Sequence, residues 1–540
     1  MITLQGKGVS DGIALGRLVF FERSSVVVER KPITDLTAEL ERFYGAKRTT
    51  SDQLDELANS MAEKIGKENA LLFEIHRMML DDSDYIDPII KMIETQMVCA
   101  EYAVEVCGKR LAQDFAEMDD TYMKERAADV DDVSRRLIGV LYGTQKAVGV
   151  GDGPVIFASD DFSPSETAQF DRRNVLALVS QQGAANSHTA IFARTMGIPA
   201  IIGLGATLAP GFGGKDAALD GETGVLYIEP DAATITAIEE KRQRLEHKKN
   251  ILEKFRGLPT LTKGGQKVKL YANIGSVADV EAVIAGDAEG IGLFRSEFLY
   301  LGRSDYPSED IQYESYRKVV EDMQGKQVII RTLDIGADKQ VEYFALPHEE
   351  NPALGMRAIR ICLTRPELFE TQLRAIYRAS AYGNTAIMFP MISDVSELRR
   401  AKKIAAGVRE KLKADNIPFN PETPVGIMIE TPAAAMISDL LAVEADFFSI
   451  GTNDLTQYTL AVDRQNNALS EFCNTHHEAI LRFIRLTAEN AHRAGIWCGI
   501  CGMLGADSEL TESFVNMGID ELSVEPSCIL DLRSRIAGYE

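Results

Sequence analysis

Apolar residues recur at helical spacing in the first long segment of the chain, residues 32–146. Two sets of them would each occupy one face of a helix: Leu54, Leu57, Met61 and Ile65, and then Ile86, Ile89, Ile90 and Ile93. The segment is rich in Glu, Lys and Ala and contains few Gly and Pro residues. This pattern predicts a helical subdomain built from long helical hairpins.

The pattern changes in residues 147–230, where Gly and Pro return and the apolar runs become short. Three of the runs have strand length: Val155–Ala158, Val175–Ser180 and Val225–Ile228. His188–Met196 lies among them and has a helical pattern. We expect a small α/β domain that residues 1–31 complete, so that the helical subdomain is inserted within it. Residues 231–259 are charged along most of their length and predict a solvated helical linker.

The last segment, residues 260–540, alternates short apolar runs with helical stretches. Eight runs are strand candidates: Val268–Ile274, Gly290–Phe294, Gln327–Asp334, Ala386–Met391, Val425–Glu430, Phe447–Gly451, Ile496–Cys501 and Glu521–Val524. Eight strand–helix units in about 280 residues is the number and length typical of a (β/α)8 TIM barrel. In that fold the functional residues lie at the C-terminal ends of the strands.

The composition disfavours several classes of protein. With 45% apolar and 26% charged residues, the chain has the balance of a folded soluble protein. Its net charge of −23 disfavours nucleic-acid binding, which requires Lys and Arg to neutralise phosphates. We find no run of 18 apolar residues and no leader at Met1–Phe20, so we expect neither membrane insertion nor secretion.

The seven cysteines are sparse and odd in number, which favours a reducing, cytoplasmic location. Cys498 and Cys501 form a CxxC motif, but no second pair follows at the spacing of a zinc site. The surrounding sequence predicts a strand, on which residues three apart face opposite ways. We therefore expect neither a disulfide nor a zinc ion here.

Charged residues follow the predicted barrel strands. Glu430 and Asp454 come from adjacent strands, and two carboxylates suit Mg²⁺, which takes its other ligands from water and substrate phosphate. Arg295, Arg331 and Arg464 lie at or shortly after strand ends, and the planar guanidinium binds phosphate and carboxylate through paired hydrogen bonds. Together these residues predict a pocket for a small phosphorylated anion with Mg²⁺ as cofactor.

His188 is a second candidate for chemistry. It follows a predicted strand and the loop 181–186, and it begins a predicted helix. The backbone N–H groups of such a loop and the helix dipole favour a bound anion and a neutral imidazole, the nucleophilic form of histidine. We predict ordinary surface or capping roles for the other histidines: His76, His247, His348, His476, His477 and His492.

Long sequence segments identify a family. They are Ser163–Gln169, Ser187–Arg194, Gly292–Tyr300, Arg331–Gly336, Asn351–Gly355, Met388–Met391, Glu430–Ala435 and Phe448–Tyr458. Over essentially its whole length the chain resembles Enzyme I of the bacterial sugar phosphotransferase system, a phosphoenolpyruvate–protein phosphotransferase. The resemblance implies a multidomain α/β fold, with the helical subdomain inserted in a swivelling phosphohistidine domain. A TIM barrel that binds phosphoenolpyruvate and forms a homodimer would follow.

The resemblance also implies roles for individual residues. His188 would take the phosphoryl group of phosphoenolpyruvate and pass it to a histidine of the phosphocarrier protein HPr, with release of pyruvate, as the first step of the system. Thr167 would be the hydrogen-bond neighbour of His188, and Cys501 would protonate the enolate. The substrate would be bound by Arg295, Arg331, Asn453, Asp454 and Arg464. Mg²⁺ would be bound by Glu430 and Asp454. The helical subdomain would dock HPr.

Two places depart from the family pattern. The loop before the histidine usually reads Gly-Gly-Arg-Thr-Ser-His, whereas Ala184, Ala185 and Asn186 precede Ser187 here. Met503 stands where the family often has Glu. Both changes affect the surroundings of a reacting group and leave the group itself in place.

Two other functions are alternatives. A pyruvate phosphate dikinase or phosphoenolpyruvate synthase would share the histidine domain and the barrel, but it needs an ATP-binding domain for which the chain has no room. The stretch Gly211–Lys215 also lacks the pattern of a P-loop. A noncatalytic phosphorelay protein would not need the complete set of charged residues and Cys501. Separate domains for histidine and barrel further predict hinges near Glu229–Ala233 and Ala147–Gly153.

Overall fold

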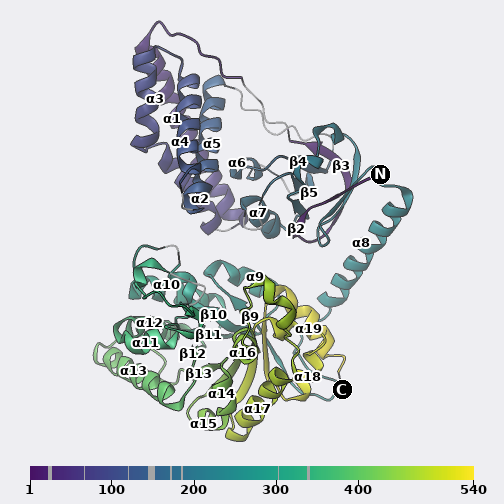
Figure 1. The fold of residues 1–540 in the computed structure, drawn as a ribbon, viewed down its shortest axis with the longest axis vertical. Coiled ribbons are helices and arrows are strands. Elements are labelled where there is room, and N and C mark those ends of the chain that lie inside the picture. Colours follow the sequence, from purple (N-terminus) through teal and green to yellow (C-terminus); the bar gives the residue numbers. More distant parts are fainter. Residues whose placement is uncertain are drawn as a thin grey trace. The chain divides into compact units, whose positions relative to one another are not determined.

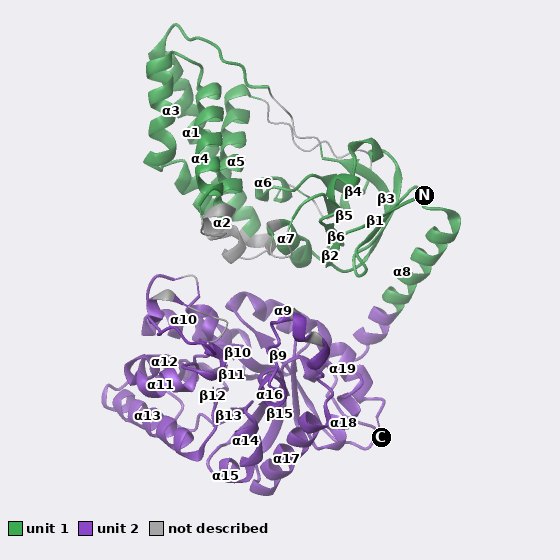
Figure 2. Ribbon diagram, in the orientation of Figure 1, with its two compact units in different colours: residues 1–247 green, residues 248–540 purple. Residues whose placement is uncertain are grey.

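The structure, a computed structural model, describes residues 1–21, 27–65, 67–118, 121–143, 153–168, 170, 173–183, 187–301, 303–336 and 341–539. It divides into two units, residues 1–247 and residues 248–540 (Figure 2). The first unit contains long helices and a mixed sheet, and the second contains a closed barrel. Within the described residues, every helix is too short or too polar to cross a lipid bilayer.

Long helices form the first part of unit 1 (Figure 1). They are α1 (Leu36–Ile65), α2 (Lys67–Met79), α3 (Ser83–Gln96), α4 (Ala100–Ala116) and α5 (Thr121–Tyr142). Leu54, Met61, Ile89 and Ile93 are buried in their shared apolar core, as the helical spacing predicts. The amphipathic pattern therefore explains how these helices pack.

One sheet forms the rest of unit 1, and its strands come from both sides of the helical segment. The strands are β1 (Ile2–Gln5), β2 (Lys7–Ser10), β3 (Ile13–Phe20), β4 (Val155–Ser159), β5 (Val175–Ser180), β6 (Ala200–Ile202), β7 (Asp216–Asp220) and β8 (Val225–Ile228). Their order is β1-β8-β7-β3-β4-β5-β6-β2. Because β3 pairs with β4, the sheet brings together the chain before and after helices α1 to α5.

Short helices connect these strands, and a long one follows them. They are α6 (Pro164–Thr167), α7 (His188–Met196) and α8 (Ala232–Glu253). Helix α8 is polar, and Ile238 is its buried residue. Lys241 pairs with Asp220 at 2.6 Å and with Glu222 at 2.7 Å, so this part of α8 is held against the β7–β8 hairpin.

Unit 2 is a closed barrel of parallel strands, as the sequence predicts (Figure 1). The strands are β9 (Lys269–Ile274), β10 (Gly290–Arg295), β11 (Gln327–Arg331), β12 (Thr385–Phe389), β13 (Val425–Ile429), β14 (Phe447–Gly451), β15 (Trp497–Cys501) and β16 (Glu521–Val524). All eight predicted runs form strands, and three of them end earlier than predicted. For β12 the reason is local, because Pro390 lacks an N–H group and Met391 has a φ of 59°.

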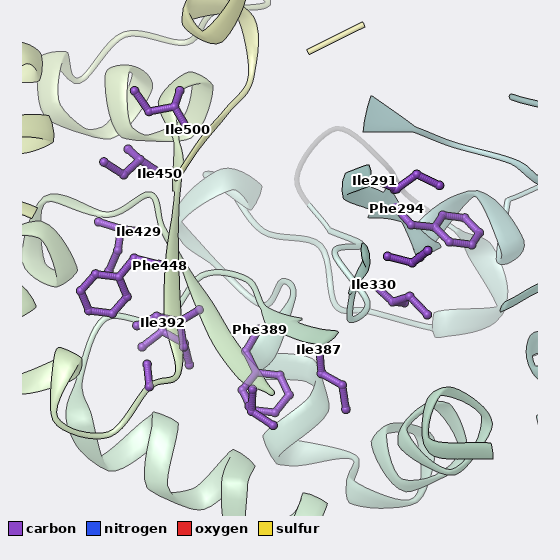
Figure 3. Packing of buried hydrophobic residues seen from close by; sticks show 14 of the residues in the cluster. Ile291, Phe294, Ile330, Ile387, Phe389, Ile392, Ile429, Phe448, Ile450 and Ile500 are labelled. Carbon is purple, nitrogen blue, oxygen red and sulfur yellow. The ribbon is translucent and has the colours of Figure 1, made fainter. Parts of the chain in front are cut away.

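Helices surround the barrel. They are α9 (Val280–Ala285), α10 (Glu309–Asp322), α11 (Ile359–Thr364), α12 (Pro366–Ala379), α13 (Val395–Ala414), α14 (Pro432–Met436), α15 (Ser438–Ala442), α16 (Thr452–Leu460), α17 (Glu478–Ala494), α18 (Thr511–Asn516) and α19 (Ile529–Ile536). Strand residues such as Ile330, Ile387, Ile429 and Ile450 belong to the large core cluster around the barrel (Figure 3). A closed sheet of this kind is a packed structure and not a pore.

Alternate strand residues form a second, smaller cluster inside the barrel, which includes Met388, Met428, Phe447 and Cys501. Cys498 belongs to the outer cluster, so the two cysteines of the CxxC motif face opposite ways as predicted. Both are free thiols. The only tryptophan of the chain, Trp497, stacks on Phe447 with ring centroids 4.6 Å apart.

The stacked Phe447 ring explains a glycine on the neighbouring strand. A Cβ atom on Gly426 would lie 2.5 Å from three atoms of this ring. We expect Gly426→Ala to lower the free energy of unfolding of the barrel by about 1–3 kcal/mol through overpacking. Gly407→Ala is the matched control, since Gly407 lies in α13 with no atom within 4 Å of its added Cβ. The control should be neutral or stabilising by up to about 1 kcal/mol.

Denaturant unfolding followed through Trp497 fluorescence measures both variants, because this residue lies in the barrel. Equal stability of the two variants would contradict the packing argument.

Candidate active site

The predicted charged residues collect at the C-terminal ends of the barrel strands. Arg295 and Arg331 are the last residues of β10 and β11. Glu430 follows β13 directly, and Asp454 lies in the first turn of α16, which follows β14. Because every strand pair in the barrel is parallel, these ends share one mouth of the barrel.

A chain of alternating charges spans this mouth. Arg331 Nη2 lies 2.6 Å from Glu297 Oε1, and its Nη1 lies 3.0 Å from Asp334 Oδ2. Arg357 continues the chain, with Nη2 at 3.0 Å from Asp334 Oδ1 and Nη1 at 3.4 Å from Asp454 Oδ1. All five side chains are buried, so their charges interact more strongly than surface ion pairs do.

The two buried arginines are held as cations. Burial alone would lower the pKa of Arg331, but the charges of Glu297 and Asp334 outweigh it and raise that pKa. In the part of the chain that the structure describes, the Nε atoms of Arg295, Arg331 and Arg357 make no hydrogen bond. These N–H groups are buried donors without a partner among the described residues, and a guanidinium with an unused donor suits an anionic ligand.

Glu430 lies beside this chain and is almost fully buried, at 1% exposure. Its Oε1 accepts a hydrogen bond from the backbone N–H of Met391 at 2.6 Å. Burial, with the negative charges of Asp454 and Asp334, raises the pKa of Glu430 to about 8 against the opposing effect of Arg331 and Arg357. Without a further cation, this carboxyl therefore keeps its proton at neutral pH.

The charge balance of the mouth fits a divalent cation. The buried carboxyls of Glu297, Asp334, Glu430 and Asp454 outnumber the buried guanidiniums of Arg331 and Arg357. No group of three or more His, Cys, Asp or Glu side chains could hold a metal ion among the described residues. Two carboxylates suffice for Mg²⁺ when water and a substrate phosphate complete its shell, so Glu430 and Asp454 are a suitable pair.

Asn453 and Cys501 meet at one edge of the mouth. The Asn453 Oδ1 accepts a hydrogen bond from the backbone N–H of Met503 at 3.2 Å, which holds the turn that follows Cys501. Thr452 Oγ1 donates to the Cys501 carbonyl at 3.3 Å. Burial raises the pKa of the Cys501 thiol to about 12, so it is protonated at neutral pH. The Met503 side chain is exposed and leaves the thiol without an acidic neighbour at this position.

Two of the predicted arginines, Arg295 and Arg464, are not part of the buried chain of alternating charges that the structure describes. Arg295 is partly exposed, with Nη2 at 3.6 Å from Glu525 Oε1. Arg464 lies in the exposed segment after α16, where its backbone N–H donates to Gln457 Oε1 at 3.2 Å. Among the described contacts, its side chain forms no ion pair with the buried carboxylates.

Helix α7 of unit 1 begins at His188, as predicted. Ser187 is its N-cap, and the Ser187 Oγ accepts a hydrogen bond from Ala190 N–H at 3.3 Å. The nearby Thr189 Oγ1 donates to the Phe162 carbonyl at 3.2 Å, which places the first turn of α7 against the segment before α6. Residues 184–186, where the sequence departs from the family pattern, lie outside the described residues. The His188 side chain is likewise outside the part that the structure describes.

Thr167 lies at the end of α6, in the segment next to α7. It is buried, and its Oγ1 donates to the carbonyls of Pro164 at 3.0 Å and Ser163 at 3.3 Å. A hydroxyl that already donates to the backbone is still an acceptor. The predicted hydrogen bond to His188 stays a prediction.

The prediction for the other histidines needs one correction. His477 caps α17, as expected, by accepting from Ala479 N–H at 3.2 Å. His76 is neither a surface nor a capping residue, because it is fully buried with Nε2 at 3.1 Å from Asp129 Oδ1. Its position on the apolar face of a helix was visible in the sequence, but its partner came from a distant helix.

Sequence reasoning missed Arg357, Glu297 and Tyr458. Arg357 joins two carboxylates and also donates to the Tyr458 hydroxyl at 2.8 Å. Arg357 and Glu297 lie in loops or short turns, where no strand pattern marks their direction. The available signal was their place in or next to the long segments that resemble the family.

Comparisons with known proteins agree with this geometry. Residues 249–540 match the model of the PEP-utilising enzyme, PEP-binding domain; residues 151–224 match its mobile domain; and residues 5–126 match its N-terminal domain. The phosphoenolpyruvate-protein phosphotransferase of Bacillus subtilis (strain 168) is 41% identical, over 99% of this chain and 94% of that protein. The protein of the same name from Geobacillus stearothermophilus is 40% identical, over 99% of this chain and 93% of that protein. The one from Staphylococcus aureus (strain MRSA252) is 37% identical, over 99% of this chain and 94% of that protein.

The chain belongs to the phosphoenolpyruvate–protein phosphotransferase family. The resemblance that the sequence segments carry is thereby confirmed over nearly the whole chain. A solved structure titled as the NMR solution structure of Enzyme I (nEIt) is 32% identical and covers 45% of this chain and 99% of its own, with a TM-score of 0.39. The predicted fold class, with a parallel barrel after a mixed α/β part, is confirmed.

The buried Glu430 makes a prediction about stability in the absence of divalent cations. Its pKa rises from an ordinary value of 4.5 to about 8 in the folded protein. Between these values the unfolded chain has lost the proton and the folded protein keeps it, so stability falls as pH rises. Glu430→Gln removes this loss. In chelator at pH 8, the free energy of unfolding of the variant should exceed that of the native protein by roughly 1–4 kcal/mol, since one pKa unit corresponds to about 1.4 kcal/mol.

At pH 4 the difference should vanish, because both states of the native protein are then protonated at this position. Urea unfolding of both proteins at the two pH values measures this change. A variant that is less stable than the native protein at pH 8 would contradict the assignment of a buried, unneutralised carboxyl.

Proposed function

We propose that the chain transfers the phosphoryl group of phosphoenolpyruvate to its own His188 and then to a histidine of the phosphocarrier protein HPr, releasing pyruvate. The observation that carries the proposal is the buried chain of arginines and carboxylates at the barrel mouth. It agrees with the names of relatives that are about 40% identical over nearly the whole chain.

The substrate suits the free donors of this mouth. Phosphoenolpyruvate carries a phosphate and a carboxylate, and guanidinium groups bind both through planar pairs of N–H groups. Arg295, Arg331 and Arg464 are our candidates for these contacts, with Asn453 as a further one. Arg357 joins them as a candidate, since its Nε–H makes no hydrogen bond among the described residues and its two carboxylate partners fix its position.

Mg²⁺ is the cofactor that these residues suit, with Glu430 and Asp454 as its protein ligands. A bound divalent cation neutralises charge on a transferring phosphoryl group. Its charge would also favour the ionised form of Glu430, whose proton is retained without it. The protein's own part is to fix both carboxyls: Met391 N–H holds Glu430, and Arg357 holds Asp454.

His188 is the proposed nucleophile. Its imidazole would attack phosphorus as the bond from phosphorus to the enol oxygen breaks, which forms a phosphohistidine and an enolate. The capped start of α7 supports this role, because the N-terminus of a helix favours the negative charge that phosphorylation adds. Thr167 is proposed to orient the ring.

Cys501 is the proposed acid for the enolate. Its thiol is buried at the barrel mouth and carries its proton at neutral pH. Transfer of that proton to the methylene carbon of the enolate gives pyruvate and leaves a thiolate. The neighbouring Asn453 holds the turn after Cys501 through Met503 N–H, which limits where the thiol can move.

The remaining proposals concern partners and location. We assign residues 1–31 and 147–230 to the phosphohistidine domain, residues 32–146 to HPr docking, residues 231–259 to the linker and residues 260–540 to substrate binding and homodimer formation. We further propose a cytoplasmic location, which the seven free cysteines favour. These assignments follow the family to which the chain belongs.

Loss of His188 tests the proposed phosphoryl acceptor. With labelled phosphoenolpyruvate and Mg²⁺, the native protein should take up one acid-labile phosphoryl group per chain, and His188→Ala should take up none. His247→Ala is the matched control, since His247 is exposed on α8 and should leave uptake unchanged. Mass spectrometry of the intact proteins measures the label, and addition of HPr should remove it. Label on His188→Ala protein would overturn the assignment.

The two reacting sites lie in different units, since His188 belongs to residues 1–247 and Glu430 to residues 248–540. In the proposed reaction His188 approaches the barrel to be phosphorylated and then turns to the docked carrier protein, so the units move with respect to one another in each cycle. Small-angle scattering should change in radius of gyration when phosphoenolpyruvate and Mg²⁺ are added to His188→Ala protein, which binds substrate without turnover. Identical curves with and without substrate would contradict the proposed hinges near residues 147–153 and 229–233.

A further inference from the structure

Glu521 is a buried acid inside the barrel that the proposed reaction does not use. It begins β16, and its side chain is 1% exposed. Inward-facing residues of neighbouring strands surround it, including Tyr271 and Cys501 of the inner cluster. A carboxyl group in this position is unusual, because the interior of such a barrel is filled mostly by branched apolar side chains.

The space for this carboxyl comes from two glycines. A Cβ atom on Gly292 would lie 2.6 Å from Glu521 Oε1, and a Cβ atom on Gly499 would overlap Glu521 Oε2. Any other residue at either position would displace the carboxyl. The side chain of Glu521 thus lies across the faces of strands β10 and β15 and not in a pocket of its own.

Gly499 also separates Glu521 from a serine. In the register of the barrel, Ser449 of β14 pairs with Gly499, and Gly499 pairs with Glu521 of β16. Gly499 has no side chain, so it contributes no side-chain atoms to the inner face between Ser449 and Glu521. Within the described residues, Ser449 Oγ and both carboxyl oxygens of Glu521 make no hydrogen bond.

Cys501 lies next to this pair. It is two residues after Gly499 on the same strand, about 6.6 Å along the strand axis, and faces the same side. The Ser449 hydroxyl lies beside the Cys501 thiol and lowers its pKa, against the larger effect of burial. The Cys501 Sγ–H itself contacts the Ile450 carbonyl at 3.6 Å. Ser449 therefore shares the inner face of the barrel with the thiol at the mouth and with the carboxyl of its own layer.

The carboxyl of Glu521 is held in its neutral form. Burial raises the pKa of Glu521 well above its ordinary value, and this outweighs the opposing effects of Lys269, its partner on β9, and of the nearby Ser523 hydroxyl. A neutral carboxyl has an O–H group to donate, and an ionised one without a hydrogen bond would be costly at this depth. An apolar side chain would fill the same space at lower cost, so packing alone does not explain a glutamate here.

We propose that Glu521 returns a proton to Cys501 through the Ser449 hydroxyl after each turnover. This inference rests on the proposed function, in which Cys501 gives its proton to the enolate. In the return step, the Cys501 thiolate takes the Ser449 hydroxyl proton as Ser449 takes the proton of Glu521. The thiol is restored and Glu521 is left as a carboxylate, which then regains a proton from solvent. Glu521 acts through Cys501 and does not touch the substrate.

Pre-steady-state kinetics separate this role from a structural one. With phosphoenolpyruvate, Mg²⁺ and excess HPr, Glu521→Gln should form its first equivalent of pyruvate at the native rate, because Cys501 begins protonated. Later turnovers should be at least tenfold slower, which gives a burst of about one pyruvate per chain. The KM for phosphoenolpyruvate should not change, since Glu521 does not contact it.

Two variants complete the test. Ser449→Ala should give the same burst, and it decides the matter if Glu521→Gln does not fold. Asp520→Asn is the matched control: Asp520 neighbours Glu521 in sequence but pairs with the partly exposed His492 at 2.8 Å. This control should show no burst and a native steady-state rate.

The outcomes distinguish the inference from the proposed function. A native steady-state rate in both Glu521→Gln and Ser449→Ala would overturn the proton return. Equal slowing of the first and later turnovers would also overturn it, because it indicates a structural role. If the native protein takes up label on His188 and the variants show either of these two outcomes, only the proton-return inference fails. If native protein takes up no label from phosphoenolpyruvate, the proposed function fails first.

Discussion

The candidate site depends on ion pairs that are removed from water. A buried guanidinium or carboxylate is stable only when its partner is in place, so the contacts of Arg331 and Arg357 with Glu297, Asp334 and Asp454 fix the mouth of the barrel as one unit. Closure of the parallel sheet makes this possible, because it brings the ends of distant strands to the same place. Binding groups are therefore positioned before any ligand arrives.

Much of the fold could be predicted because it follows from periodicity. The helical spacing of Leu54 and Met61 and the eight apolar runs of the barrel each indicate one kind of element, and both patterns are realised. Strand ends were less predictable. The end of β12 depends on Pro390 and on the left-handed Met391, whose N–H is turned toward Glu430, and that contact spans 39 residues.

The position of site residues could be predicted where a residue ends or soon follows a strand, and less so in the longer loops. Glu430 and Arg331 were predicted because they stand at the ends of barrel strands, where the functional residues of this fold lie. Arg357 was not found, because it lies in a loop and its role depends on carboxylates 23 and 97 residues away. Glu521 was read only as the start of a strand, since its surroundings come from β10 and β15 as much as from its own strand.

The alternating row of charges also constrains how this sequence can change over generations. Reversing or deleting one member leaves its neighbours in the row buried with fewer opposite charges. Arg357 illustrates this, because its loss would leave Asp454 buried without its guanidinium partner and would leave Asp334 paired with Arg331 alone on the other side. Substitutions in the row should therefore be tolerated only as concerted exchanges, so homologues should vary at these five positions together or not at all.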